Sequence, residues 1–406
     1  MTGPLSKYRI LDLSTIGMGP YATQIMGDLG ADIIKIEEPG GGDMMRAQAQ
    51  GRNPGMSPLF LTLNRNKRSL VLNLKSPRGR EVLLRLIRDA DALITNIRPG
   101  ALSKLGVDYE SVRHCNPRLV YCSLVGFGSK GRYAGRPAFD DIIQGVSGLA
   151  GLHARTHGSP QLVPAWIADQ TVGLVAVHTV LAALLEREAT GLGQHVEVPM
   201  FESMVQFVMT PHLCAHTLQP PTHPAGYKRL FERRVHATSD GHICGGPYTR
   251  DQWHRFFDIA GRPDMAASGR YDTQLDIAGH IDELYDAFAE ALSRGSTAEW
   301  LDKLLAADIA AMPIHTLESI QDDPHLKDEG FFVDSRHPTE GLIRTMNVPT
   351  DWSRSVPEHR RHAPSLGEHS EEILKELGYA PDDIQALFDC GASHAHRGSP
   401  GAGNDL

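Results

Sequence analysis

The first third of the sequence alternates short, β-branched apolar runs with stretches of helical pattern. Residues 8–13 (YRILDL) and 32–36 (DIIKI) predict strands, and residues 20–29 between them predict a helix. Strand, helix and strand in this order are typical of a parallel βαβ unit. The alternation continues with a helix near 79–88 and strands at 92–96 and 119–125. The sequence therefore predicts an α/β fold with a Rossmann-like, doubly wound large domain.

One long segment, residues 171–188, is apolar around most of its helical circumference. Its apolar residues are Val172, Leu174, Val175, Val177, Val180, Leu181, Leu184 and Leu185. A helix that is apolar on nearly all sides is expected to be buried. The pattern ends at a turn at 190–193, and a strand is predicted at 195–198.

The character of the sequence changes after this strand. Residues 219–229 are rich in Pro and Gly and predict a linker. Helical patterns at 251–260, 280–293 and 297–306, with short strands around the turn at 239–241, predict a smaller α+β domain at 230–328. We expect the large domain to comprise 1–218 and 329–390. The small, polar residues 391–406 predict a disordered tail.

Charge and hydropathy argue against two kinds of partner. The 406 residues carry 40 Lys and Arg against 49 Asp and Glu, a formal net charge of −9, so no attraction to nucleic acid or anionic membranes is expected. Apolar stretches such as 172–185 are too short to cross a bilayer core of roughly 30 Å. The N-terminus has neither an apolar signal core nor an Arg-rich presequence. We therefore expect a cytoplasmic protein.

The cysteines and histidines give no clear metal or disulfide pattern. Five cysteines without a CxxC spacing argue against a disulfide framework. The nearest approach to a metal site is His212, Cys214 and His216. On a helix, residues i and i+4 share a face but residue i+2 does not, so we expect no metal there.

A glycine motif follows the first predicted strand. Residues 17–22 (GMGPYA) fit the GxGxxA pattern, and Glu37 follows 20 residues after Gly17. This spacing is typical of dinucleotide binding, with the pyrophosphate at a helix N-terminus and the acid on a ribose. Pro20 lies near the start of the helix and lacks a backbone donor. A NAD-dependent oxidoreductase and a glycine turn that only packs a helix onto its strand both remain open.

Two further features have a structural and a functional interpretation. The basic run at 64–68 (NRNKR) is either a solvated loop or an anchor for phosphate groups. Asp169 lies just before the buried helix that is expected from about residue 171. It is either the N-cap of that helix or a carboxylate held in a closed site by the helix dipole.

Together, several segments resemble the family III (CaiB/BaiF-like) CoA-transferases, which include formyl-CoA transferase and, on a separate branch, α-methylacyl-CoA racemase. The resembling segments are ILDLSTIGMGPYATQIMGDLGADIIKIEEPGGGD (10–43), NRNKRSLVLNLKSPRG (64–79), TNIRPGALSKLGVDYE (95–110), IADQTVG (167–173), TGLGQHVEVPMFES (190–203) and SLGEHSEEILKELG (365–378). The resemblance implies an interlocked homodimer that takes CoA and acyl-CoA as substrates and holds no permanent cofactor. It also implies that the loop after the first strand contacts CoA.

The resemblance also implies roles for individual residues. Asp169 matches the catalytic aspartate, which forms an aspartyl-acyl anhydride and then an aspartyl-CoA thioester. The positions expected to contact CoA are Gly17, Met18, Leu72, Lys75, Asn96, Ile97, Arg98, Lys104 and Asp140. Glu38 stands where formyl-CoA transferase has a basic residue.

Three departures bear on the reaction. Phe139 replaces the acid/base histidine of the racemase branch and cannot move a proton, so racemisation is the less favoured alternative. Gln48, and Gly245-Gly246 in place of a polyglycine lid, argue against transferring the formyl/oxalate specificity. We expect the donor to be an acyl-CoA, for example succinyl-CoA, and the acceptor to be a small carboxylic or dicarboxylic acid. Arg46 or Arg65 could bind a second carboxylate.

Overall fold

A computed structural model describes residues 3–396 of the chain. Within these residues, a seven-stranded sheet has the order β12-β3-β2-β1-β4-β5-β6. Its strands are β1 (Arg9–Leu13), β2 (Asp32–Glu37), β3 (Lys67–Leu72), β4 (Ala92–Thr95), β5 (Val120–Val125), β6 (His195–Pro199) and β12 (Ser393–His394). Every neighbouring pair is parallel except β12 with β3. The order 3-2-1-4-5-6 confirms the predicted Rossmann-like, doubly wound fold.

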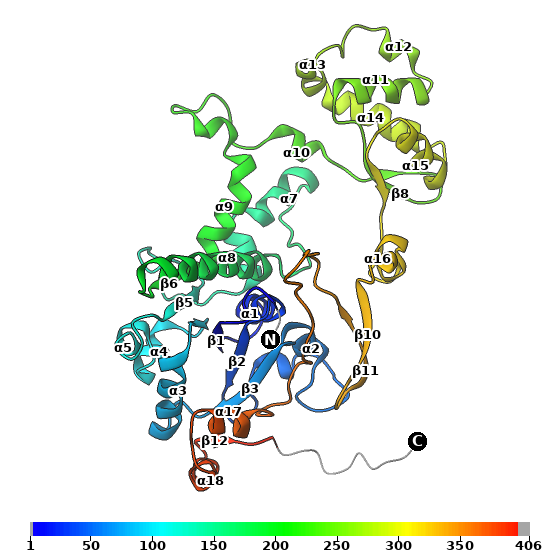
Figure 1. Ribbon diagram of the computed structural model, residues 1–406. Helices are drawn as coiled ribbons and strands as arrows, with labels where there is room; N and C mark the ends of the chain where they lie inside the picture. The colour runs from blue at the N-terminus through cyan, green and yellow to red at the C-terminus, as the bar shows by residue number, and fades with distance from the viewer. Residues whose placement is uncertain (1–2, 397–406) are drawn as a thin grey trace, which may run out of the picture. The chain divides into compact units, whose positions relative to one another are not determined.

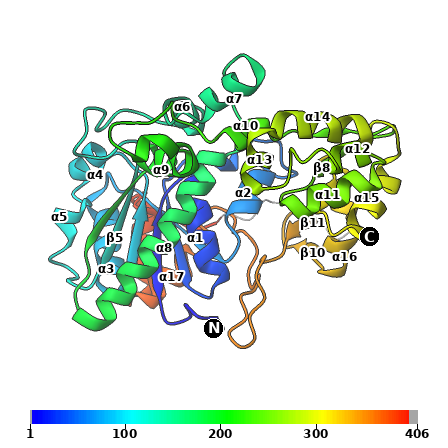
Figure 2. The same ribbon diagram turned by 90° about the horizontal axis from the view of Figure 1, so that it is seen from above.

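Apolar residues cover both faces of this sheet, as a parallel sheet requires. Ile10 and Ile33 point to one core, together with α1 (Met18–Asp28) and α8 (Ile167–Thr190). Leu11 and Ile34, one residue further along each strand, point to the other core. There they meet α3 (Pro77–Asp89), α17 (Ser370–Glu376) and α18 (Pro381–Asp389). Figure 1 shows these two groups of helices on opposite faces, and Figure 2 shows α1 alongside α8.

Helix α8 is longer than the apolar stretch on which the membrane prediction was based. It runs for 24 residues, so it is the one helix in residues 3–396 whose length and apolar composition could span a bilayer. Core helices satisfy the same criterion, and α8 packs against α1, α6, β5 and β6. Its length alone therefore says little about a membrane.

The other elements complete two compact units. The first unit, which contains the large sheet, includes α2 (Pro58–Leu63), α4 (Pro99–Leu105), α5 (Tyr109–Val112), α6 (Asp140–Val146), β10 (Phe332–His337) and β11 (Gly341–Met346). The second holds α10 (Lys228–Glu232), β7 (His236–Ala237), β8 (His242–Gly245), α11 (Arg250–Ile259), α12 (Pro263–Ala266), α13 (Gln274–Gly279), α14 (Ile281–Leu292), α15 (Thr297–Ala306) and β9 (Ala311–Pro313). Trp253, Phe256 and Phe288 lie in its separate core. Helices α7 (Leu149–His157) and α9 (Met200–His212) cross the division between the units, and α16 (Pro324–Asp328) ends at it.

The units divide at different residues from those predicted. The first comprises residues up to 151, 161–208 and from 328 onward, and the second comprises 152–160 and 209–327. The division near 208 falls inside α9, where the composition does not change. The predicted linker at 219–229 therefore lies within the second unit and includes the start of α10.

The predicted disordered tail is wrong for residues 391–396. Ser393 pairs with Leu72 in the antiparallel β12–β3 ladder, and its Oγ donates to the Val71 carbonyl at 2.7 Å. This short strand covers an otherwise open sheet edge. Residues 397–406 lie outside the described residues.

The basic run at 64–68 is neither a solvated loop nor a phosphate anchor. Lys67 lies in β3, is fully buried, and donates from Nζ to Asp12 Oδ2 at 3.0 Å. Arg65 and Arg68 form ion pairs with Asp28 at 2.8 Å and Asp32 at 2.7 Å. The sequence analysis did not predict this strand, because its charged residues are buried by ion pairs with residues far away in the sequence.

The buried pair of Lys67 and Asp12 gives a first prediction. We expect Lys67→Met to lower the free energy of unfolding by about 3–5 kcal/mol, because it leaves a buried carboxylate without its closest cation. Lys375→Ala is the control, since its pair with Glu371 is exposed on both sides and should contribute less than about 1 kcal/mol. Chemical denaturation would measure both. Equal losses for the two variants would contradict the prediction.

Candidate active site

A cavity of about 720 Å³ lies at the carboxyl ends of β1, β4 and β5. The strand order reverses between β1 and β4, where open α/β sheets commonly bind their ligands. Seven of the predicted site residues line it: Gly17, Met18, Asn96, Ile97, Arg98, Lys104 and Asp169. The structure thus brings together residues that lie more than 150 positions apart in the sequence.

Three predicted CoA contacts do not line this cavity. Leu72 is 1% exposed and lies in β3 between β2 and β12. Lys75 is exposed beyond the end of β3. Asp140 begins α6, and its side chain bonds to α8. The prediction of ligand contacts is therefore not supported by the cavity at these positions.

Asp169 lies inside the first turn of α8 and is not its N-cap. The helix begins at Ile167, two residues before Asp169, and its N-cap is Trp166, whose side chain makes no capping bond. The carboxylate of Asp169 faces the cavity and has no hydrogen-bond donor among residues 3–396. Burial, and then the nearby charge of Asp140, raise its pKa to about 7. A carboxylate with a strongly perturbed pKa in a cavity is a candidate catalytic group.

Gly17 allows the β1–α1 loop to approach this carboxylate. A Cβ at position 17 would lie 2.4 Å from Asp169 Oδ2 and 3.1 Å from Asp169 Cγ. The preceding residue, Ile16, has φ +73, a left-handed conformation that is costly for a β-branched side chain. The loop must therefore be held in place by its surroundings.

Asn96 and Asp43 hold that loop. The Asn96 side chain accepts from the Thr15 amide at 3.0 Å and donates to the Thr15 carbonyl at 2.8 Å. Asp43 Oδ1 accepts from the Ile16 amide at 3.0 Å. Asn96 was expected as a CoA contact, but its side-chain amide forms hydrogen bonds with the loop that carries Gly17.

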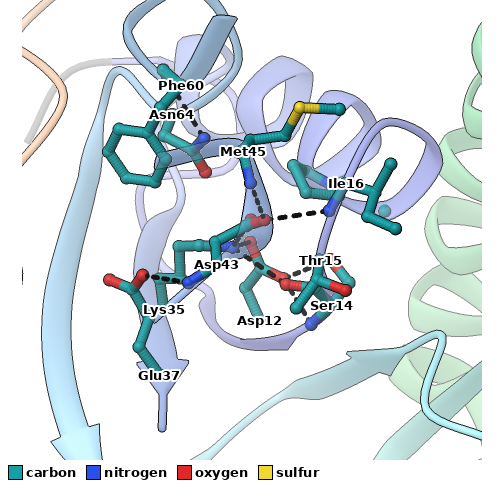
Figure 3. Close-up of polar contacts among 12 residues, drawn as sticks. Asp12, Ser14, Thr15, Ile16, Lys35, Glu37, Asp43, Met45, Phe60 and Asn64 are labelled. Atoms are coloured by element: carbon teal, nitrogen blue, oxygen red, sulfur yellow. Dashed lines mark hydrogen bonds and ion pairs between the residues drawn. The ribbon is translucent and has the colours of Figure 1, made fainter. Parts of the chain in front are cut away.

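Beneath the loop lies a network of buried charges (Figure 3). Lys35 Nζ donates to the Ser14 carbonyl and is 2.8 Å from Asp43 Oδ2. Asp12 accepts from Ser14 and Thr23 and pairs with Lys67. All these side chains except that of Ser14 come from outside the loop, so the strands, α1 and the segment after β2 together fix the path of residues 14–16.

A second loop, residues 126–138, forms another part of the cavity lining. Its Gly128 amide donates to Glu202 at 3.1 Å, and its Ser129 amide donates to Glu197 at 2.8 Å. Phe127 and Arg136 from this loop line the cavity, as does Glu197. The sequence analysis missed these residues, because no local pattern marks a loop that is tethered from β6 and α9.

The structure contradicts the dinucleotide interpretation of the glycine motif. Glu37, which would have to hold a ribose, is 4% exposed. Its carboxylate accepts from Arg46 at 2.7 and 2.8 Å and from Ser69 Oγ at 2.6 Å. No oxygen is left to face a nucleotide.

The same contacts overturn the suggestion that Arg46 or Arg65 binds a second carboxylate of the substrate. Arg46 is 2% exposed and paired with Glu37, and Arg65 is 6% exposed and paired with Asp28. Neither lines the cavity. The cations that do are Arg98, Lys104 and Arg136.

Residues 3–396 contain no group of three or more His, Cys, Asp or Glu side chains arranged to hold a metal ion. The His212-Cys214-His216 segment spans the end of α9 and a short 3-10 helix, Cys214–Thr217.

Comparison with known proteins identifies the family. The family model described as CoA-transferase family III matches residues 5–370. The chain belongs to this family. It is 32% identical to the succinate–glutarate CoA-transferase of Agrobacterium fabrum (strain C58), over 92% of this chain and 96% of that protein. It is also 32% identical to the formyl-CoA:oxalate CoA-transferase of Escherichia coli O157:H7, over 95% of this chain and 99% of that protein.

A solved structure agrees with this assignment. A CaiB/BaiF family protein from Brucella suis superposes with a TM-score of 0.79 at 28% identity, over 93% of this chain and all of that one. The resemblance drawn from the sequence motifs is confirmed. The protein is an enzyme with family III CoA-transferase activity, whose substrates are CoA thioesters and carboxylic acids.

The close approach of Gly17 to Asp169 predicts a specific sensitivity. Gly17→Ala should fold normally, since only the end of one side chain must move, but it should lower transferase kcat roughly a hundredfold by displacing the carboxylate. Gly100→Ala is the matched control, because Gly100 lines the same cavity and a Cβ there meets nothing within 4 Å. Steady-state kinetics and thermal unfolding would test both. Equal kcat values for the two variants would refute the argument.

Proposed function

We propose that Asp169 is the covalent nucleophile of CoA transfer in this enzyme. The observation that carries the proposal is a mostly buried carboxylate without a hydrogen-bond donor, facing a cavity at the switch point of the sheet. A carboxylate that accepts no hydrogen bond is more reactive in attack, because no such bond has to be weakened as the new bond forms. Its raised pKa near 7 also makes it a stronger nucleophile than an ordinary aspartate, because nucleophilicity rises with basicity.

The reaction begins with two displacements at carbonyl carbon. An Asp169 oxygen attacks the thioester carbonyl of the donor, the carbon–sulfur bond breaks, and CoA leaves as a thiolate with the electron pair. The thiolate then attacks the γ-carbonyl of the resulting anhydride. The donor acid leaves as its carboxylate, and an aspartyl-CoA thioester remains.

The second half reverses these displacements with the acceptor. The acceptor carboxylate attacks the γ-carbonyl of the thioester and releases the CoA thiolate. The thiolate then attacks the acceptor carbonyl of the new anhydride, which gives acceptor acyl-CoA and restores the Asp169 carboxylate. No proton, oxidant or reductant is consumed.

Each displacement passes through an oxyanion that needs hydrogen-bond donors. The first amides of α8 are unsuitable, because those of Ala168 and Asp169 already donate to Asp140. The start of α1 is better placed. The amides of Gly17 and Met18 border the cavity and have no partner within residues 3–396. We therefore assign the oxyanion to the N-terminus of α1, which also carries positive dipole charge.

We limit the proposed CoA contacts to residues of the cavity: Gly17, Met18, Asn96, Ile97, Arg98 and Lys104. Arg98 and Lys104 are exposed and free of ion pairs within residues 3–396, so both can meet phosphate groups. Leu72 and Lys75 are omitted because they lie outside the lining.

We propose that the acceptor is a dicarboxylic acid and that the donor is an acyl-CoA, for example succinyl-CoA. Both relatives named above carry dicarboxylic acids in their names: succinate, glutarate and oxalate. Arg136 is a cation of the cavity lining that the CoA assignment leaves unused, and it can pair with a second carboxylate. Phe139, also in the lining, offers no proton-transfer group, which supports transfer over racemisation.

We also propose that the enzyme is a homodimer, as the resemblance implies. Large apolar side chains are exposed on three helices of the first unit: Ile142 and Val146 on α6, Leu174 and Leu185 on α8, and Phe207 on α9. Exposed apolar groups of this extent commonly mark protein interfaces.

The nucleophile is tested by removal and by trapping. Asp169→Ala should lower transfer by roughly a thousandfold or more while folding normally. Wild-type enzyme is mixed with an acyl-CoA that it accepts as donor, without any acceptor acid. Mass spectrometry should then show a CoA adduct on the peptide that contains Asp169. Asp141→Ala, which removes an exposed charge nearby, should retain both activity and adduct. An adduct that persists in Asp169→Ala would disprove the assignment.

The acceptor class is tested with acids of equal chain length. With succinyl-CoA as donor, we expect kcat/KM for glutarate to exceed that for pentanoate at least tenfold, because one charge-assisted hydrogen-bonded pair contributes about 1.5–3 kcal/mol. Arg136→Gln should remove most of this preference and leave pentanoate little affected. Equal rates for the two acids in wild type would show that a second carboxylate is not recognised.

A further inference from the structure

Asp140 makes a contact that its expected role as a CoA ligand does not explain. Its Oδ2 accepts from the backbone amides of Ala168 at 2.8 Å and Asp169 at 2.9 Å. These two amides belong to the first turn of α8 and have no partner inside the helix. Asp140 therefore caps α8 from a different helix, 28 residues earlier in the chain.

The other oxygen of Asp140 is also occupied. Gln144, one turn later on α6 and 2% exposed, donates from Nε2 to Asp140 Oδ1 at 2.6 Å. Gln144 Oε1 accepts from the Val163 amide at 2.9 Å, and Nε2 also reaches the Val163 carbonyl at 3.1 Å. Asp140 and Gln144 thus fix both the start of α8 and the segment that leads into it.

These contacts set the position of the reacting group. The amide of Asp169 is held directly, so its Cα and the direction of its side chain depend on Asp140. Trp166, the N-cap residue, supplies no side-chain cap of its own. A carboxylate also brings negative charge close to the carboxylate of Asp169, and this opposes its ionisation.

We propose that Asp140 is a positioning residue, which holds the first turn of α8 so that Asp169 faces the cavity. The inference rests on the proposed role of Asp169 as nucleophile. It replaces the expectation that Asp140 contacts CoA.

Other charged groups line the cavity, and their effects on Asp169 must be distinguished from the effect of Asp140. They are Arg98 and Lys104 near α4, Arg136 in the 126–138 loop, and Glu197 on β6. None of them has a hydrogen bond to Asp169 among the described contacts, whereas Asp140 binds its backbone and also raises its pKa. The variants must therefore change Asp140 alone.

Two variants separate the charge of Asp140 from its capping bond. Asp140→Asn keeps an oxygen acceptor for the two amides but removes the charge, whereas Asp140→Ala removes both. Asp141→Asn is the matched control, because it removes the same charge from the next residue, which is exposed and bonds only locally to Ile142.

The readout is the pH dependence of kcat and KM for the acyl-CoA donor. In wild type and Asp141→Asn, activity should rise with pH through a midpoint near 7, because the nucleophile is the ionised carboxylate. In Asp140→Asn the midpoint should fall by about one unit, with the plateau kcat retained within about threefold. Asp140→Ala should lower the plateau kcat by about ten- to a hundredfold, because the helix end loosens. KM for the donor should change little in both.

An increase in KM for the acyl-CoA in Asp140→Asn, with an unchanged midpoint, would overturn the proposal in favour of a direct CoA contact. A wild-type plateau and midpoint in both Asp140 variants would overturn it as well. If Asp140→Ala does not fold, the isosteric Asp140→Asn decides the question by its midpoint. Failure of the nucleophile assignment is distinguishable, since it would show as CoA adducts that persist in Asp169→Ala.

Discussion

The active site depends on a pair of lysines buried beneath the β1–α1 loop. Lys35 and Lys67 enter from β2 and β3, and both are fully buried. They pair with Asp43 and Asp12, which in turn bond to the loop. Charges buried in this way are tolerated only when every partner is in place. The network therefore commits the loop to one path, including the unfavourable conformation of Ile16, and this path brings Gly17 against Asp169.

Such a network fixes the β1–α1 loop at residues 14–17, which include Ile16 at positive φ and the helix N-cap Gly17. Any loop loses conformational entropy on being ordered, and a glycine such as Gly17 loses most, so this cost must be overcome before the loop can present ordered donors. In this enzyme the sheet supplies the order through Asp43, Lys35 and Asn96. The loop can then lie next to the carboxylate of Asp169.

The sequence was informative where structure is encoded locally. Periodic apolar runs identified five of the six parallel strands, and the glycine motif marked the loop that lines the cavity. Strand β3 was missed because Lys67 and Arg68 are buried by pairing with Asp12 and Asp32, from segments more than 30 residues away. The capping role of Asp140 was hidden for the same reason, because nothing near residue 140 indicates the α8 amides. Asp169 was marked by its place before the buried helix, but only the family resemblance favoured a catalytic role over an N-cap.

Two helix ends meet at the cavity, and their amides have separate tasks. The amides of α8 are already satisfied by Asp140, so this helix can orient Asp169 without donating to it. A donor bond to the carboxylate would lower its pKa and weaken it as a nucleophile. In the proposed mechanism, the amides at the start of α1 bind the substrate oxygen. In that mechanism one helix holds the nucleophile and another stabilises the oxyanion, so the carboxylate stays reactive while the transition state still meets fixed donors.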